Sequence, residues 1–207
     1  MTDRVLLVAT LNVGKRVEIT RLLRAGLGDL AGRLEVRDLA ARPGYEAPVE
    51  DGETYLDNAL LKARAAAGGD AAVLADDSGI EVAALGGAPG IRSARWALTP
   101  AGGEMSGSGR NRALLARVGD TDRRDAAMVS NVVLLVPGLA PVVGRGRVEG
   151  TLAREERGSG GFGYDAIFLL RDGRRLSEVA GAEKDRVGHR GQAVRAVLPA
   201  LMAWIKE

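Results

Sequence analysis

The chain has 207 residues, of which 46% are hydrophobic and 27% charged, and this suffices for one compact domain with a sizeable core. It has no cysteine, which excludes disulfides, thiolate metal sites and a cysteine nucleophile. A formal net charge of +2 is too small to indicate a nucleic-acid surface by itself.

The first half of the chain predicts alternating strands and helices. Apolar runs predict buried strands, and apolar residues at helical spacing predict amphipathic helices. In chain order we expect a strand over 4–10, a helix over 15–25, a strand over 34–38, a loop over 43–53, a helix over 55–68 capped by Thr54, and a strand over 71–75. A glycine-containing loop is expected to follow, as far as about Arg92.

The second half predicts mainly strands. In chain order we expect a mobile Gly/Ser-rich stretch over 101–110, a short helix over 111–118, antiparallel strands between 126 and 154, a strand over 164–170 that runs into a tight turn at Asp172-Gly173, and a helix over 191–206 kinked by Pro199. The whole pattern predicts an α/β fold with a mixed sheet.

The sequence also predicts the cellular location of the protein. No apolar run reaches the roughly 18 residues that a membrane helix needs. The opening "MTDRVLLVATLN" places an acid beside a base and is a poor signal peptide. We therefore expect a cytoplasmic protein that makes no contact with a membrane.

The stretch "LLVATLNVGKRVEI" predicts a strand, a short loop with Gly14 and then a helix. Amide groups at a helix N-terminus bind anions in this geometry, and Lys15 adds a positive charge. It is not a Walker A loop, because Ala9 and Arg16 stand where that motif needs Gly and Ser or Thr. An ordinary strand-to-helix turn explains the segment equally well.

Five acidic residues and no basic ones lie between Pro43 and Leu61. Mg²⁺ binds one or two carboxylates together with substrate phosphates, so the acidic side chains of this segment are candidate metal ligands. A solvated acidic loop is the simpler interpretation of the segment alone. Lys62 would then pair with Asp57 on the helix surface.

The stretch "LADDSG" places two adjacent carboxylates at the end of a buried strand. Neighbouring residues of a strand face opposite sides of the sheet, so one of Asp76 and Asp77 would enter a site while the other braces the loop. The competing interpretation is a turn that begins at an aspartate.

Two later segments carry candidate ligand contacts. In "GSGGFGYDAIF", Phe162 lies between glycines on a loop, where its ring would stack on a base or simply fill the core. In "AEKDRVGHRGQA", the only histidine, His189, precedes Arg190 at a helix start. This pair would donate hydrogen bonds to carbonyl or phosphate oxygens, or merely cap the helix at the surface.

Five segments together resemble the inosine triphosphate pyrophosphatase family, also called non-canonical purine NTP or dITP/XTP pyrophosphatases. They are "ATLNVGK" (9–15), "EDGETYLDNALLKA" (50–63), "DDSGIEVAALGGAPGIRSARW" (76–96), "GFGYDAIF" (161–168) and "KDRVGHRGQA" (184–193). They follow the family's order and span the chain nearly end to end. Ala166 stands where the family has Pro, and Gly188 where it has Ser.

The resemblance implies a single domain over 1–207, an elongated α/β fold with a long central mixed β-sheet and two lobes flanking a substrate cleft. It implies Mg²⁺-dependent hydrolysis of ITP, dITP and XTP to the monophosphate and pyrophosphate, which cleanses the nucleotide pool. The expected partner is a small nucleoside triphosphate, without nucleic acid or membrane, and the expected assembly is a homodimer.

The resemblance also implies site residues. Asp77 is the implied catalytic base, although the sequence leaves open whether Asp76 takes that role. Glu50 and Asp77 are the implied Mg²⁺ ligands. The implied substrate-binding residues are Thr10, Leu11, Asn12, Val13, Gly14, Lys15, Lys62, Ser78, Phe162, Gly163, Tyr164, Asp165, Lys184, His189 and Arg190.

Three other functions compete with this one. A pyrophosphatase for modified pyrimidine nucleotides would share the lysine-bearing first loop, but would not be expected to have both Phe162 and the His189-Arg190 pair. A nucleotide sensor without turnover would not need both Glu50 and Asp77. An RNA-binding protein would use the many arginines, which here are scattered rather than striped.

Overall fold

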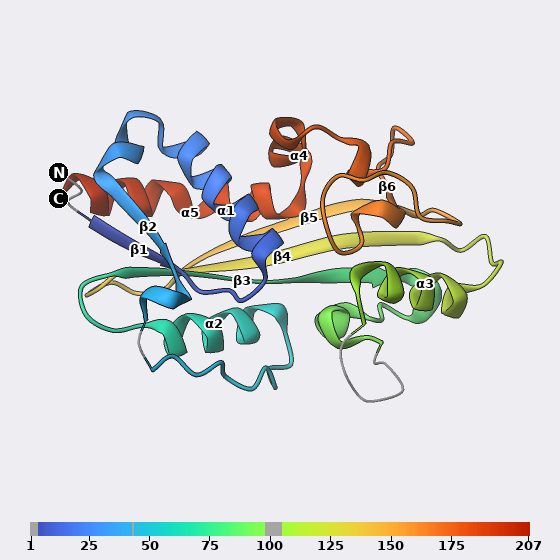
Figure 1. The fold of residues 1–207 in the computed structure, drawn as a ribbon, viewed down its shortest axis with the longest axis horizontal. Coiled ribbons are helices and arrows are strands. Elements are labelled where there is room, and N and C mark those ends of the chain that lie inside the picture. The colour runs from blue at the N-terminus through green and yellow to red at the C-terminus, as the bar shows by residue number, and fades with distance from the viewer. Residues whose placement is uncertain (1–3, 43, 98–104) are drawn as a thin grey trace. The chain divides into compact units, whose positions relative to one another are not determined.

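The structure is a computed structural model that describes residues 4–42, 44–97 and 105–207. Its strands are β1 (Arg4–Val8), β2 (Leu34–Asp38), β3 (Ala72–Val82), β4 (Asp125–Leu135), β5 (Val142–Leu152) and β6 (Phe168–Leu169). Its α-helices are α1 (Val13–Leu27), α2 (Tyr55–Ala66), α3 (Gly107–Val118), α4 (Gly181–Val187) and α5 (His189–Lys206) (Figure 1). None of the helices in these ranges is long and apolar enough to cross a bilayer.

The strands form one mixed sheet in the order β2-β1-β3-β4-β5-β6. Strand β1 pairs in parallel with β2 on one side and β3 on the other, with Leu6 opposite Val36 and Ala72. Strands β5 and β6 pair antiparallel. The parallel pairs require crossover connections, and the segments containing α1 and α2 provide them. The predicted α/β class and mixed sheet are confirmed.

The described chain divides into two compact units. Unit 1 comprises Met1–Asp77, Ser130–Gly146 and His189–Glu207, and unit 2 comprises Ser78–Val129 and Arg147–Gly188. Strands β3, β4 and β5 each supply residues to both units. Each unit has its own apolar core.

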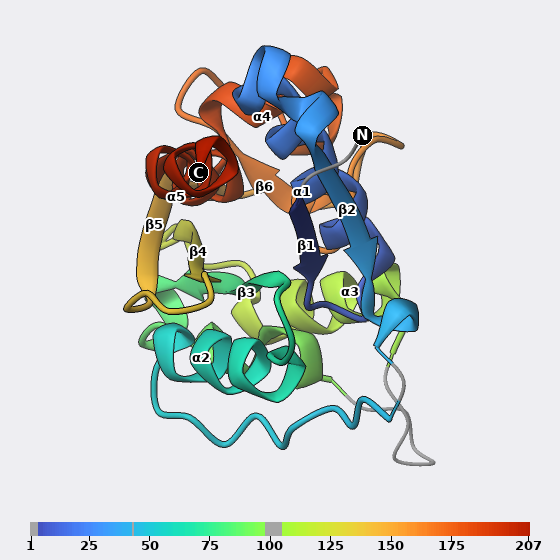
Figure 2. The same ribbon diagram turned by 90° about the vertical axis from the view of Figure 1, so that its left-hand side faces the viewer.

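In unit 1, helices cover both faces of the strands (Figure 2). One face, which we call the α1/α5 face, buries Leu74 and Val132 against apolar side chains of α1 and α5. The opposite face, which we call the α2 face, buries Val73 and Val133 against Ala59 and other small residues of α2. Successive strand residues therefore alternate between the two faces, as strand geometry requires.

In unit 2, the core lies around the end of β3, helix α3 and the segment that leads into β6. Ile80, Leu114 and Phe168 are fully buried there. Ser106 caps α3 by accepting a hydrogen bond from the Gly109 amide. This cap and the buried Leu114 explain why a glycine- and serine-rich segment is helical.

Several predicted elements are confirmed. Strand β2 has the predicted bounds, and the turn at Asp172-Gly173 is present, with the Gly173 amide donating to Leu170. Thr54 caps α2 and forms a reciprocal capping box with Asp57. Helix α5 begins two residues earlier than predicted and continues through Pro199.

Other predictions are wrong in extent. Strand β3 does not end at Ala75 but continues to Val82, because the carboxylates that follow have buried cationic partners. Helix α3 begins at Gly107, so the second part of the segment predicted as mobile is helical, and 101–104 lie outside the described residues. The strand predicted over 164–170 is reduced to β6, after a 3-10 turn at Asp165–Ile167.

Candidate active site

The loop after β1 is organised by its own side chains. The Asn12 side-chain oxygen accepts the Lys15 amide at 3.0 Å and caps α1, while the Thr10 hydroxyl accepts the Asn12 amide at 3.2 Å. Both side chains therefore shape the loop. The first amides of the helix, at Val13 and Gly14, have no carbonyl within the helix to bind, and this favours an anion at the helix N-terminus. Leu11 and Val13 are strongly exposed.

Asp76 is fully buried on the α1/α5 face and is surrounded by donors. Lys15 Nζ lies 3.0 Å from its carboxylate, Arg190 Nε lies 3.5 Å away, and the Ser130 hydroxyl donates at 2.5 Å. Burial by itself would raise the pKa of Asp76, but the charges of Lys15 and Arg190 and the Ser130 hydrogen bond outweigh it and hold the pKa well below its usual range. These partners therefore favour the ionised form of Asp76 at neutral pH.

Arg190 belongs to this buried charge network. Its Nη1 donates to Glu18 at 2.9 Å, and Arg190, Glu18 and the adjacent His189 are almost completely buried. Two cations, Lys15 and Arg190, thus face two anions, Asp76 and Glu18. The interpretation of the His189-Arg190 pair as a surface cap is wrong. Glu18 was not predicted from the sequence, although a charged residue beside Ile19 on the apolar side of α1 was a usable signal.

Asp77 lies on the α2 face. Lys62 Nζ donates to its carboxylate at 2.7 Å, and the Asn58 side-chain nitrogen lies 3.5 Å away. Burial raises the pKa of Asp77 above its usual value, although Lys62 and Lys15 act in the opposite direction. Asp76 and Asp77 therefore face opposite sides of β3, as predicted, and their pKa values move in opposite directions.

The acidic loop is tied to this group through α2. Lys62 Nζ also lies 3.7 Å from Glu50, whose side chain is about a quarter exposed. Asn58 accepts the Gly52 amide at 2.9 Å, and a Cβ atom at Gly52 would lie only 2.6 Å from the Asp57 side chain. The simpler interpretation, in which Lys62 pairs with Asp57 on the helix surface, is wrong, because Lys62 bonds to Asp77 and Asp57 takes part in the capping box.

The carboxylate oxygens of Glu50 and Asp77 suit a hard cation. Glu50 and Asp77 converge on a single positive charge, the ammonium of Lys62, as two carboxylates do around a bound ion. Within the described ranges no cluster of three or more acidic or histidine side chains forms a closed metal cage. Two carboxylates with further ligands from substrate is the arrangement typical of Mg²⁺.

In unit 2, Asp165 organises the predicted base-stacking loop. Lys184 Nζ donates to its carboxylate at 2.6 Å, and the Phe162 amide donates to the same oxygen at 2.8 Å. Lys184 Nζ also lies 5.0 Å from the centroid of the Phe162 ring, within cation–π range. Gly161 is required here, since its φ is +73° and a Cβ would lie 2.2 Å from Asp165.

Two further hydrogen bonds hold the same loop of unit 2. The Asn111 side chain of α3 donates to the Gly163 carbonyl at 3.0 Å. The Tyr164 hydroxyl donates to the Ser93 carbonyl at 2.7 Å, and burial raises the pKa of Tyr164 to about 12. Asn111 was not predicted from the sequence. Ser78, which was, lies half-buried in β3.

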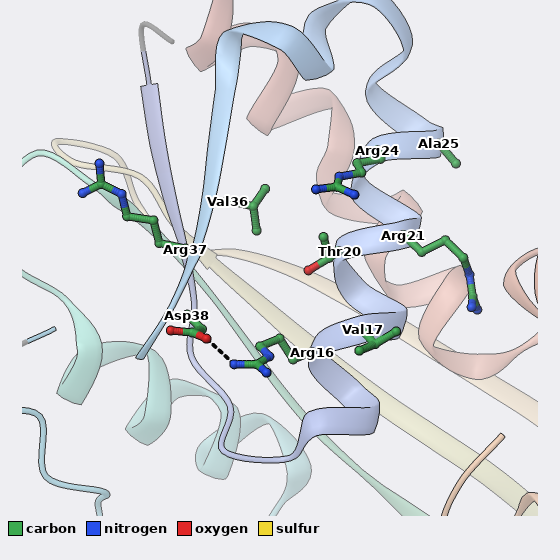
Figure 3. Close-up of a pocket in the computed structure, with 9 residues that line it drawn as sticks. All are labelled: Arg16, Val17, Thr20, Arg21, Arg24, Ala25, Val36, Arg37 and Asp38. Carbon is green, nitrogen blue, oxygen red and sulfur yellow. Dashed lines mark hydrogen bonds and ion pairs between the residues drawn. The ribbon is translucent and has the colours of Figure 1, made fainter. Parts of the chain in front are cut away.

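A cavity of about 770 Å³ lies elsewhere in unit 1, between α1 and β2 (Figure 3). Its lining includes Arg16, which pairs with Asp38, and Arg24, which points into the space. It includes none of the residues predicted to bind substrate. The cavity and the predicted site are thus separate features of unit 1.

The structure therefore gathers the predicted residues into two groups. The unit 1 group contains Thr10, Asn12, Lys15, Glu50, Lys62, Asp77, His189 and Arg190, to which the structure adds Glu18, Asn58, Asp76 and Ser130. The unit 2 group contains Phe162, Gly163, Tyr164, Asp165 and Lys184, to which the structure adds Asn111.

Comparison with known proteins gives one family. The model of the Ham1 family matches residues 6–200. The chain is 49% identical over 203 residues to a protein of Mycobacterium tuberculosis named dITP/XTP pyrophosphatase, covering 95% of this chain and 94% of that protein. It is 42% identical over 210 residues to a protein of the same name from Symbiobacterium thermophilum, with complete coverage of both.

Solved structures of Ham1 proteins have a fold similar to that of this chain. The Ham1 protein of Coxiella burnetii has a TM-score of 0.80 at 33% identity, over 97% of this chain and 99% of that one. The Ham1 protein of Staphylococcus aureus has a TM-score of 0.78 at 31% identity, over 98% of each chain. The resemblance that the five sequence segments predicted is confirmed.

Proposed function

Since the chain belongs to the Ham1 family, we propose that it is a pyrophosphohydrolase that converts dITP and XTP to the monophosphate and pyrophosphate. Relatives named dITP/XTP pyrophosphatase support the substrate class. The observation that carries the proposal is the divergence of two adjacent carboxylates. Asp76 has a lowered pKa and is paired with cations, whereas Asp77 has a raised pKa and is paired with Lys62, which also lies near Glu50. Such divergence is typical of residues with different catalytic roles.

Asp77 is the proposed base. A general base must accept a proton from the attacking water. Burial, which raises the pKa of Asp77 in the metal-free protein, favours proton uptake by this carboxylate. Asp76 is a poor base because Lys15, Arg190 and Ser130 favour its ionised form. We therefore assign Asp76 the role of holding Lys15 at the start of α1, where its ammonium meets a phosphate group.

The proposed reaction is an in-line attack of water on the α-phosphorus. The water oxygen bonds to that phosphorus as its proton passes to Asp77. The bond from phosphorus to the oxygen that bridges to the β-phosphate breaks, and pyrophosphate leaves with the electron pair. Lys15 and Lys62 neutralise the charge on the phosphates, which is the main task in phosphoryl transfer.

Glu50 and Asp77 would hold Mg²⁺, since both carboxylates converge on one positive charge. When bound, the ion would neutralise phosphate charge and favour deprotonation of a nearby water. Asn58 keeps the two ligands in place, because it contacts both Asp77 and the backbone of the loop that carries Glu50.

The Phe162 loop of unit 2 is the proposed base-binding element. Its ring offers a face for stacking, and Asp165, Lys184 and Asn111 fix the loop around it. Hypoxanthine and xanthine carry an oxygen at position 6 where adenine carries an amino group. A site with buried N–H donors for that oxygen can reject the amino compound by roughly 10⁴-fold. ITP shares the oxygen and is a proposed third substrate.

The proposal is tested with purified protein, Mg²⁺ and five nucleotides. We expect dITP, XTP and ITP to yield pyrophosphate, with kcat/KM values roughly 10³-fold or more above that of dATP, and dGTP to be a poor substrate too. Equal turnover of dATP and dITP would contradict the substrate class. Release of orthophosphate instead of pyrophosphate would contradict the reaction.

A further inference from the structure

The cavity between α1 and β2 is a feature of unit 1 that the proposed reaction does not use. It measures about 770 Å³, and its lining includes none of the residues assigned to substrate or metal. Small-molecule sites in proteins occupy roughly 300–1,000 Å³. The cavity is therefore large enough for a small solute, and the chemistry of its lining indicates which kind.

One side of α1 presents three polar side chains to β2. Arg16, Thr20 and Arg24 line the cavity at four-residue spacing, which places them on the same side of the helix. Figure 3 shows the Arg24 guanidinium pointing from α1 into the cavity, with Thr20 between the two arginines. Arg24 is exposed, and Thr20 and Val36 are half-buried, so a dissolved molecule can reach this group.

The charges on the cavity lining do not balance. Asp38 is the one acidic residue among the described side chains that border the cavity, and it is already paired with Arg16. Arg24 has neither a hydrogen-bond nor an ion-pair partner within 4–42, 44–97 and 105–207. The other two lining arginines, Arg21 and Arg37, point away from the cavity (Figure 3). The interior of the cavity therefore carries an excess of positive charge at Arg24.

We propose that this cavity is an anion site, which takes the phosphate group of a small molecule between Arg24, Thr20 and Arg16. A guanidinium is a planar fork that donates two N–H groups to two phosphate oxygens, and the Thr20 hydroxyl adds a further donor. Inorganic phosphate and organic phosphate esters share this group, and the apolar Val36 offers a surface to the remainder of an ester. The inference goes beyond the proposed function, because no step of that reaction takes place in this cavity.

The test is a titration of ¹⁵N-labelled protein with sodium phosphate at pH 7, followed through the backbone amide shifts in NMR spectra. Sodium chloride keeps the ionic strength constant, so that screening does not change during the titration. We expect saturable shifts at the amides of Thr20, Arg24 and Val36. Arg24→Met should raise the dissociation constant read from Thr20 and Val36 by about 10-fold or more, because a charged donor to the phosphate is lost.

Arg64→Met is the matched control, since it removes the same charge from the exposed surface of α2, outside the cavity lining. We expect this variant to bind phosphate as the wild-type protein does. A parallel titration with AMP distinguishes the two sources of the phosphate group. Tighter binding of AMP at Thr20 and Val36 would identify an organic phosphate as the occupant, whereas equal or weaker binding would identify inorganic phosphate.

The same spectra separate this inference from the proposed function. Shifts confined to Val13 and Gly14 would place the phosphate at the start of α1 and overturn the cavity site, while leaving the proposed active site intact. Equal dissociation constants for the wild-type protein and Arg24→Met would also overturn it. Arg24→Met should keep wild-type turnover of dITP, and a loss of turnover together with phosphate binding would contradict a separate site. Phosphate binding at Thr20 and Arg24 would stand even if dITP were not a substrate.

Discussion

Asp77→Asn is expected to lower kcat by about 10³-fold or more, with the fold unchanged. The amide has the shape of the carboxylate but cannot accept the proton of the attacking water. It is also a weaker ligand for a hard cation than the carboxylate that contacts Lys62 at 2.7 Å. Steady-state kinetics with dITP measure the loss, and circular dichroism with thermal unfolding verifies the fold.

Asp70→Asn is the matched control. Asp70 is an exposed aspartate in the turn before β3, outside the group around Lys62. We expect this variant to keep wild-type kcat and KM. Near-normal turnover in Asp77→Asn would remove the proposed base. A loss of folded protein in Asp77→Asn would instead identify a structural role, because the kinetic defect would then follow the loss of native enzyme.

Arg190→Met is expected to lower the free energy of unfolding by about 3–5 kcal/mol, because it leaves two buried carboxylates without their shared cation. The guanidinium lies 2.9 Å from Glu18 and 3.5 Å from Asp76, and all three side chains are at least 96% buried. For a chain of this size the loss corresponds to a fall of roughly 6–20 °C in melting temperature. Urea unfolding at pH 7 measures it.

Arg64→Met provides the control, since Arg64 is exposed on α2, and it should change stability by less than about 0.5 kcal/mol.

The difference in stability between Arg190→Met and the wild-type protein should also depend on pH. Arg190 helps to hold the pKa of the Asp76 carboxyl below its usual range. A carboxyl whose pKa is lower in the folded protein stabilises the fold at pH values above its pKa in the unfolded chain. That contribution is lost as the pH falls towards its pKa in the folded protein. The effect of Arg190→Met should therefore persist from pH 8 to pH 5 and shrink below about pH 4. A difference as small as that of Arg64→Met would contradict the buried network.

The sequence was sufficient for features that depend on local geometry. Thr54 was correctly identified as a cap because the capping pattern extends over only a few residues. The opposite orientations of Asp76 and Asp77 followed from strand periodicity alone. The five family-like segments led to the correct family because each retains its residues in the family order.

Features that depend on distant partners could not be predicted. Glu18 and Arg190 are 172 positions apart, and Ser130 is 54 positions from Asp76. Two adjacent aspartates normally indicate the end of a buried strand, because burying them unpaired is too costly. Strand β3 continues through them only because Lys15 and Lys62, which come from two different helices, neutralise them.

The central claim is that water attacks the α-phosphorus of a nucleoside triphosphate. It is tested most directly by turnover of dITP in H₂¹⁸O, followed by mass spectrometry of both products. The account predicts that one ¹⁸O atom appears in the nucleoside monophosphate and none in the pyrophosphate. Label in the pyrophosphate would place the attack at the β-phosphorus, and label in orthophosphate would mean that a different bond is broken. Either result would contradict the roles assigned to Lys15, Lys62 and Asp77.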